Sequence, residues 1–143
     1  MQELCNVSVV VGVDAELDEE SVDDVRQTED VIVSQWIEIS ADERHQMRDQ
    51  VDEILRPLGF EASLLVIRRA NSLALYFICM TLSAIMGLRG QWSSRRLRDT
   101  VESLFTFLSH VTRQVRVKRL IWPHTDYERC LQFFRSLPGK QTI

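Results

Sequence analysis

Two apolar runs separated by a short polar turn constrain the fold of this chain more than any other feature. Residues 62–69 (ASLLVIRR) and 73–79 (LALYFIC) are both strand-like, and Ala70, Asn71 and Ser72 stand between them. Runs of this length around such a turn predict a β-hairpin. Both faces of the second run are apolar, which is typical of a central strand with at least partial cover on each side.

The N-terminal part of the chain predicts two more strands separated by a loop. Residues 6–13 (NVSVVVGV) alternate and are rich in valine, so they predict a short strand. Residues 14–30 are dominated by acids and lack apolar periodicity, which favours a solvated loop. A second strand is expected at 31–39, with one face formed by Val31, Val33, Ile37 and Ile39.

A helix is expected after the second strand. Ser40 and Glu43 have the spacing of a capping box, in which each residue satisfies a backbone donor of the other. Pro57 and Gly59 predict the end of this helix. Its apolar positions have helical spacing: Met47, Val51, Ile54, Leu55 and Leu58.

The part of the chain after the hairpin predicts three helices and one strand. Thr81 is a cap for a short helix that loosens at Gly87 and Gly90, and Ser93 or Ser94 is a cap for a longer one. The core stripe of the longer helix is Leu97, Val101, Leu104, Phe105 and Leu108. A strand is expected at 114–122, stopped by Pro123, and a capping box at 125–128 opens the last helix.

The resulting order is β-α-β-β-α-β-α with an extra N-terminal strand. This order predicts an α+β fold, a ferredoxin-like α/β sandwich with a mostly antiparallel sheet and helices packed on one face. We expect residues 1–30 to form an acidic strand and loop segment before an α+β domain at 31–138.

Charge is distributed very unevenly along the chain. Residues 1–53 hold 16 of the 21 acidic side chains and 3 of the 17 basic ones, whereas residues 54–143 have a balance of +9. Opposite charges of this kind serve recognition and assembly. We expect acidic residues of the first half to pair with cations at the start of a helix, where cations are otherwise unfavourable. The acidic set is Glu19, Glu20, Asp23 and Asp24, and the basic set is Arg95, Arg96 and Arg98.

These two sets lead to alternative assembly states. If the acidic segment covers the basic set of its own chain, the domain is a closed monomer. If it reaches the basic set of a neighbour, the contact builds a homo-oligomer. We favour self-association, because recruitment functions usually need several binding sites together.

Composition and the cysteines bear on the cellular setting. The chain has 143 residues and 45% hydrophobic content, which fits one globular domain. Three cysteines without metal or redox spacing argue against a secreted disulfide framework. Residues 70–88 contain no charged side chain, which leaves a single membrane span as an alternative, although polar residues interrupt the segment.

The sequence contains no recognisable catalytic or cofactor motif. The three histidines are far apart, and no Walker loop, GxSxG or GxGxxG sequence is present. Paired acids at Glu19 and Glu20 lack the spacing of a calcium loop. We therefore expect neither enzymatic activity nor a metal or other cofactor.

Nucleic-acid binding is a second alternative, because the same element order occurs in RNA-recognition modules. The basic residues Arg116, Lys118 and Arg119 lie in one expected strand. However, the central strands lack the aromatic signature that stacks bases. We therefore expect no nucleic-acid partner.

Three stretches of the chain together resemble the TRADD N-terminal domain family. They are residues 67–85 (IRRANSLALYFICMTLSAI), 96–108 (RLRDTVESLFTFL) and 115–134 (VRVKRLIWPHTDYERCLQFF), which ends in a helix with the sequence ERCL. TRADD is the death-domain adaptor of tumour-necrosis-factor receptor signalling. The resemblance covers about residues 55–134, mostly at core positions.

The resemblance implies a non-enzymatic adaptor domain that recruits signalling proteins in cell-death or innate immune signalling, with TRAF-type partners. The family's partner-contacting surface includes the hairpin, where the matching positions here are Arg68, Ala70 and Ala74. None of the three keeps the chemistry of the family residue. Because the hairpin belongs to that surface, we still expect partner binding there, at Arg68, Arg69, Ala70 and Ala74. We expect neither a nucleic acid nor a membrane as partner.

Overall fold

The structure is a computed structural model that describes residues 7–42, 44–59, 62–109 and 114–137. Cys5, Asn6 and Glu43, which entered the sequence predictions, lie outside the described residues. The elements along the chain are β1 (Val9–Leu17), α1 (Val22–Ala41), α2 (Arg48–Leu55), the 3₁₀ turn η2 (Arg56–Leu58), β2 (Ala62–Arg69), β3 (Leu73–Cys79), α3 (Leu82–Ser93), α4 (Arg96–Ser109), β4 (Val117–Ile121) and α5 (His124–Arg135).

The four described strands form one sheet in the order β2-β3-β1-β4, and each neighbouring pair is antiparallel. β1 and β2 run parallel with β3 between them, and β3 and β4 run parallel with β1 between them. This is the split arrangement of a ferredoxin-like sandwich, so the predicted α+β fold is confirmed. The predicted hairpin and the central position of residues 73–79 are also confirmed.

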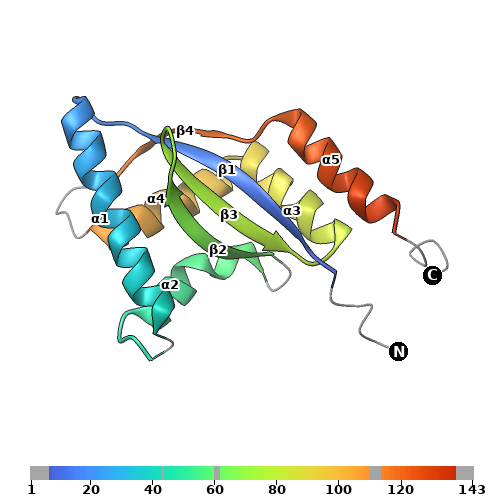
Figure 1. Cartoon of the computed structure of the whole chain (residues 1–143), viewed down its shortest axis with the longest axis horizontal. Helices are drawn as coiled ribbons and strands as arrows, with labels where there is room; N and C mark the ends of the chain where they lie inside the picture. Colours follow the sequence, from blue (N-terminus) through green and yellow to red (C-terminus); the bar gives the residue numbers. More distant parts are fainter. Residues whose placement is uncertain (1–6, 43, 60–61, 110–113, 138–143) are drawn as a thin grey trace.

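The helices cover one face of the sheet. Figure 1 shows α3 and α4 behind the strands and α1 with α2 beside β2, while no helix lies in front of β1 and β3. Alternate residues of β1 are buried toward the helices (Val11, Val13, Ala15 and Leu17), opposite the buried Leu73, Leu75 and Phe77 of β3. The predicted stripe of α4 is buried throughout (Leu97, Val101, Leu104, Phe105 and Leu108). The core therefore lies between the sheet and the helices.

The predicted loop at 14–30 and the predicted strand at 31–39 are wrong. Residues 14–17 are the second half of β1, and α1 runs without interruption from Val22 to Ala41. The Ser21 hydroxyl caps α1 by accepting a hydrogen bond from the Asp24 backbone N–H (3.1 Å). The side chains that α1 buries have helical spacing (Ile32, Trp36 and Ile39), whereas Val31 and Ile37 of the expected strand face are exposed.

The predicted boundary after residue 30 falls inside α1. β1 lies between β3 and β4, so residues 7–30 belong to the same sheet and helix layer as the rest of the described chain. β1 is thus the first strand of the β-α-β-β-α-β order. The strand predicted at 31–39 is part of a helix, so β1 is not an additional strand before that order.

Two of the predicted caps are also wrong. Ser40 lies in the last turn of α1 and donates its hydroxyl to the Ile37 carbonyl (3.4 Å), while α2 begins after Met47 without a side-chain cap. The last helix begins at His124, directly after Pro123, so Thr125 lies inside the helix. Pro123 occupies the N-cap position and provides no side-chain cap.

The region around α3 mixes confirmed and wrong predictions. Thr81 caps α3 as predicted, since its hydroxyl accepts a hydrogen bond from the Ala84 N–H (3.0 Å). The helix continues through Gly87 and Gly90 to Ser93, which the sequence did not predict. Ser93 and Ser94 donate their hydroxyls back to carbonyls of α3 and do not cap α4.

The uncharged segment 70–88 divides among a hairpin turn, β3 and the first half of α3. Within the described ranges, no helix has the length and apolar character needed to cross a membrane. The proposed span at 70–88 is therefore wrong, because residues 73–79 in its middle form a strand inside the sheet.

Candidate functional site

The structure places the four predicted partner-binding residues in or beside the β2–β3 hairpin. Arg68 pairs in register with Ala74 across the two strands, and Ala70 is exposed in the turn. The Ala74 side chain is buried, so it is not available for direct contact with a partner. Arg68, Arg69 and Ala70 are exposed, although Arg69 is held in ion pairs with α1.

Arg68 and Arg69 are neighbours in the chain, but their side chains leave β2 on opposite faces, as in any strand. Arg69 lies on the helix side, where its guanidinium pairs with Glu29 (3.2 Å) and with Asp30, both in α1. Arg68 is exposed on the other side and forms no ion pair within the described ranges. Arg69 therefore holds β2 to α1, and Arg68 is the cation that a partner can reach.

The Glu29 carboxylate is the buried member of this ion pair, with a side chain only 4% exposed. Burial raises its pKa above the ordinary value of about 4.5, and the Arg69 guanidinium works in the opposite direction. Arg69 thus offsets part of the cost of burying this carboxylate.

The face of the sheet opposite the helices carries an apolar strip, which we call the open sheet face. In register, Val10 of β1 lies beside Ile78 of β3, and Gly12 lies beside Tyr76, which in turn pairs with Val66 of β2. Val10 is 51% exposed, and the other side chains of the strip are half-buried. No described element covers this strip.

Gly12 lets the Tyr76 ring lie flat on the sheet. A Cβ atom at position 12 would come within 3.1 Å of the Tyr76 Cε1 atom, which is closer than ordinary van der Waals contact. The absence of a side chain at Gly12 therefore leaves room for the Tyr76 ring on the open sheet face.

Charged side chains flank one end of the strip. Glu16 of β1 accepts a hydrogen bond from the Arg119 guanidinium of β4 (2.7 Å), and Asp14 lies beside Ile121. Arg68 lies at the opposite edge of the sheet, on β2. The open sheet face thus combines an apolar centre with charges of both signs at one end.

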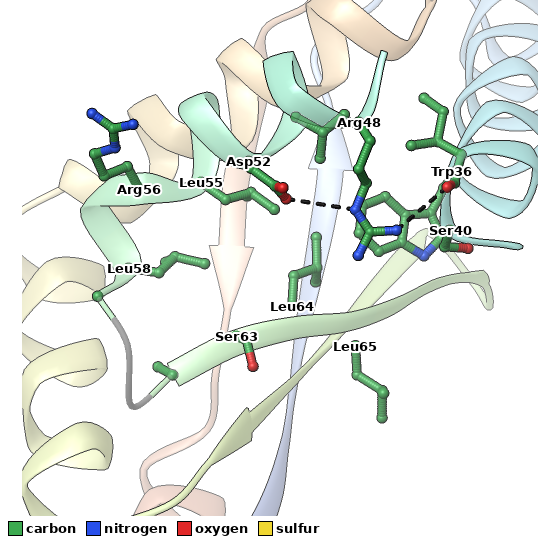
Figure 2. A pocket seen from close by; sticks show the side chains of 14 residues that line it. Trp36, Ser40, Arg48, Asp52, Leu55, Arg56, Leu58, Ser63, Leu64 and Leu65 are labelled. Carbon is green, nitrogen blue, oxygen red and sulfur yellow. Dashed lines mark hydrogen bonds and ion pairs between the residues drawn. The ribbon is translucent and has the colours of Figure 1, made fainter. Parts of the chain in front are cut away.

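A second concave surface lies at the outer edge of β2, and we call it the α2–β2 pocket. Its volume is about 860 Å³, and it is enclosed by the end of α1, by α2 and η2, and by the first half of β2. Figure 2 shows Leu55, Leu58 and Leu64 directed into it, with Trp36 forming one end. Most of the lining is apolar.

The polar side chains of the α2–β2 pocket stand at its rim and are paired with one another. The Arg48 guanidinium lies 3.6 Å from the Asp52 carboxylate and 3.4 Å from the Ile39 carbonyl, as Figure 2 shows. Arg56 pairs with Glu53 (2.6 Å). The rim therefore has little net charge to offer a ligand.

The two charge sets predicted for assembly lie at the starts of different helices. The acidic set (Glu19, Glu20, Asp23 and Asp24) surrounds the start of α1, and Arg96 and Arg98 begin α4. In Figure 1 the start of α1 lies at the edge of the molecule, away from the junction of α3 and α4. The structure does not bring the two sets together within one chain.

Individual members of these sets already have partners. Glu19 accepts a hydrogen bond from the Thr28 hydroxyl (3.1 Å), and Arg98 pairs with the largely buried Glu102 (3.7 Å). Glu102 also accepts the Val117 N–H (2.7 Å), which fastens β4 to α4. Arg95 and Arg96 remain exposed and form no ion pair within the described ranges.

The described residues offer little reactive chemistry. They contain no group of three histidine, cysteine or acidic residues arranged to hold a metal ion. Burial raises the pKa of Cys79 to about 12, with a smaller effect from Cys130, and it also raises the pKa of Cys130. Both thiols therefore remain protonated at neutral pH, and a protonated thiol is a poor nucleophile.

Sequence reasoning missed the α2–β2 pocket. Its walls include Trp36 and Ile39, which the sequence assigned to a strand, and Val51 and Leu55, which it assigned to the core. The signal was the helical spacing of Ile32, Trp36 and Ile39, which competed with an alternating pattern in the same residues.

Comparison of the chain with protein-family models, with curated proteins and with solved structures found no match.

Proposed function

We propose that this domain is a non-enzymatic protein-interaction domain that recruits a partner protein through the open sheet face. The observation that carries the proposal is the apolar strip of Val10, Val66, Tyr76 and Ile78, which no described element covers. Apolar side chains gathered on one exposed face are typical of a binding surface. An aromatic ring in the middle of the surface, here Tyr76, suits the anchor of such an interface.

The charges on the open sheet face define the partner's surface. Glu16 and Arg119 neutralise each other, whereas Arg68 has no ion-pair partner within the described ranges. The proposed partner therefore presents an apolar patch with an acidic side chain placed to meet Arg68. Asp14, an acidic residue on the same face, disfavours a nucleic acid, whose phosphates it would repel.

The cellular role that we propose is that of a cytoplasmic adaptor in cell-death or innate immune signalling, with TRAF-type proteins among the candidate partners. This part of the proposal is supported by the resemblance to the TRADD N-terminal domain family alone.

Affinity capture from cytosol with matched variants tests the proposal. Val10→Glu places a charge in the apolar strip, and Arg68→Glu reverses the accessible cation. Val22→Glu and Arg135→Glu make the same changes at exposed positions in α1 and α5, away from the strip. Circular dichroism verifies that all four variants fold.

We expect the captured signalling proteins to be lost with Val10→Glu and Arg68→Glu and retained with the two controls. An unchanged set of proteins with all four variants, or capture of nuclease-sensitive RNA in place of protein, would overturn the proposal.

A further inference from the structure

β2 is an edge strand of the sheet, because the strand order places β3 on one side of it and no described strand on the other. Every edge strand presents unpaired backbone N–H and C=O groups along its free side, and these groups can pair with a further extended chain. Natural proteins usually cover or charge such an edge. Here the far end of β2 is covered, since Arg69 joins it to Glu29 and Asp30 of α1.

The first half of β2 is different, because it forms a wall of the α2–β2 pocket. Ala62, Ser63, Leu64 and Leu65 all line the cavity. α2 stands on the other side, and its Leu55 with Leu58 of η2 supplies an apolar wall facing the strand, as Figure 2 shows. The uncovered strand edge and the apolar wall therefore enclose the same space.

A β-bulge shapes this part of β2. The register passes from Leu64 opposite Phe77 to Val66 opposite Tyr76, so Leu65 has no partner in β3. Figure 2 shows Leu64 directed into the pocket and Leu65 directed to the other side of the strand. Bulges bend a strand and re-aim its side chains. The bend leaves Leu64 available to contact a ligand in the pocket.

The shape of the pocket restricts what can occupy it. A volume of about 860 Å³ is near the upper end of the range for small-ligand pockets, about 300–1,000 Å³. α2 lines this part of the edge together with β2, so an occupant has to fit between the two elements. A single extended segment fits between the two walls and satisfies the strand edge, which a lipid or another apolar small molecule would not do.

We propose that the α2–β2 pocket binds an extended peptide segment of a partner protein, which adds to the sheet beside Ala62–Leu65. Alternate side chains of an added strand point to opposite faces. One set would contact Trp36, Leu55 and Leu58, so the segment is apolar at every second position. The mutually paired charges of the rim favour a segment without net charge in its centre.

This inference shares with the proposed function only the premise that the domain binds a protein. The surface is different, because the peptide would bind in the α2–β2 pocket and not on the open sheet face. Its probe is a library of linear peptides of about eight residues, an ordinary strand length, with Val, Ile or Leu at alternate positions. A parallel library carries N-methyl groups on every second amide, which removes the donors that strand addition needs.

Three readouts identify strand addition. Selected peptides should perturb the fluorescence of Trp36, and Trp36→Phe should abolish that change. Hydrogen exchange of the β2 amides between residues 62 and 65 should slow on binding. Leu55→Glu should weaken binding at least about tenfold, equivalent to roughly 1.4 kcal/mol, whereas Val10→Glu on the open sheet face should leave it unchanged.

Several results would overturn the inference while leaving the open sheet face untouched. They are failure of the folded domain to select any peptide, equal binding of the N-methylated library, and binding without slower exchange in β2. Loss of peptide binding with Val10→Glu would also contradict it, because it would place the peptide on the open sheet face.

Discussion

At the scale of single residues, the neighbours Arg68 and Arg69 have different surroundings, although the sequence treats them alike. Arg69 neutralises Glu29, a carboxylate whose side chain is 4% exposed, whereas Arg68 faces solvent. Removing one partner of a buried ion pair leaves a desolvated charge, which costs more than the loss of a surface pair.

We predict that Arg69→Ala lowers the free energy of unfolding by about 1–2 kcal/mol at pH 7, a value reduced for the partial exposure of Arg69. Arg68→Ala, the matched control, should change it by less than about 0.5 kcal/mol. The loss with Arg69→Ala should shrink toward pH 4, where Glu29 is protonated. The sign follows from linkage, because a carboxyl whose pKa is raised in the folded state destabilises the fold as pH rises through that pKa.

Urea unfolding of both variants at several pH values measures these differences. Equal effects of the two substitutions, or a loss with Arg69→Ala that does not depend on pH, would show that the Arg69–Glu29 pair does not hold β2 to α1.

At the scale of elements, the junction between α3 and α4 depends on one unusual backbone conformation. Arg95 lies between the two helices with φ of 72°, a left-handed conformation that costs a side-chain-bearing residue about 1 kcal/mol or more. We predict that Arg95→Gly raises the free energy of unfolding by up to about 1 kcal/mol. Arg96→Gly, at the first residue of α4, should lower it by less than about 1 kcal/mol, which is the cost of glycine in a helix interior.

Thermal unfolding of the two variants gives the comparison. Destabilisation by Arg95→Gly as large as that by Arg96→Gly would mean that the left-handed junction is not strained.

The elements that the sequence predicts correctly are those in which one pattern dominates. The hairpin and the stripe of α4 each have a single periodicity, so their assignment survives in the structure. In residues 31–39 two patterns overlap. Val31, Val33, Ile37 and Ile39 alternate as in a strand, while Ile32, Trp36 and Ile39 recur as in a helix, and packing against α4 and β2 favours the helix.

The candidate site could be predicted only in part for the same reason. The hairpin itself was predicted correctly, but its sequence could not show that Arg69 pairs with α1 while Arg68 has no such partner within the described ranges. The α2–β2 pocket forms where α1 and α2 pack beside the edge strand β2. It could not be predicted, because no local sequence pattern indicates which strand lies at the edge of the sheet.

At the scale of the whole molecule, the uneven charge has two roles. Glu16 pairs with Arg119 and Glu29 pairs with Arg69. Some acids of the first half of the chain therefore stabilise the fold through ion pairs with arginines of the second half. The exposed acids at the start of α1 and the exposed Arg95 and Arg96 lie apart on the surface, so they are available for contact between copies.

We predict weak head-to-tail self-association at low salt through these two surfaces. Each exposed ion pair contributes only about 0–1 kcal/mol, so several must act together, and about 0.5 M salt should dissociate the assembly. Arg95→Glu with Arg96→Glu should abolish it, and so should Glu20→Lys with Asp23→Lys. A mixture of the two double variants should associate again, because each supplies the charge that the other needs.

Light scattering of each sample at low and high salt decides between the outcomes. A single monomeric mass in every sample would show that the exposed charges do not drive assembly.

The position of β1 in the sheet determines when the protein can finish folding. β1 is made before the other three described strands, yet its neighbours are β3 and β4, and Asp14 pairs with both Ala74 and Ile121. More than a hundred residues after β1, through β4, must leave the ribosome before the second edge of β1 is occupied. During synthesis, β1 is thus an apolar strand without its neighbouring strands. Its contacts with β3 and β4 join residues distant in sequence, and such contacts form slowly. In a nascent chain stalled before β4, β1 would be an uncovered edge strand of an incomplete sheet. Such unpaired strand edges make folding intermediates prone to aggregation, which is why we expect chaperones to bind this one.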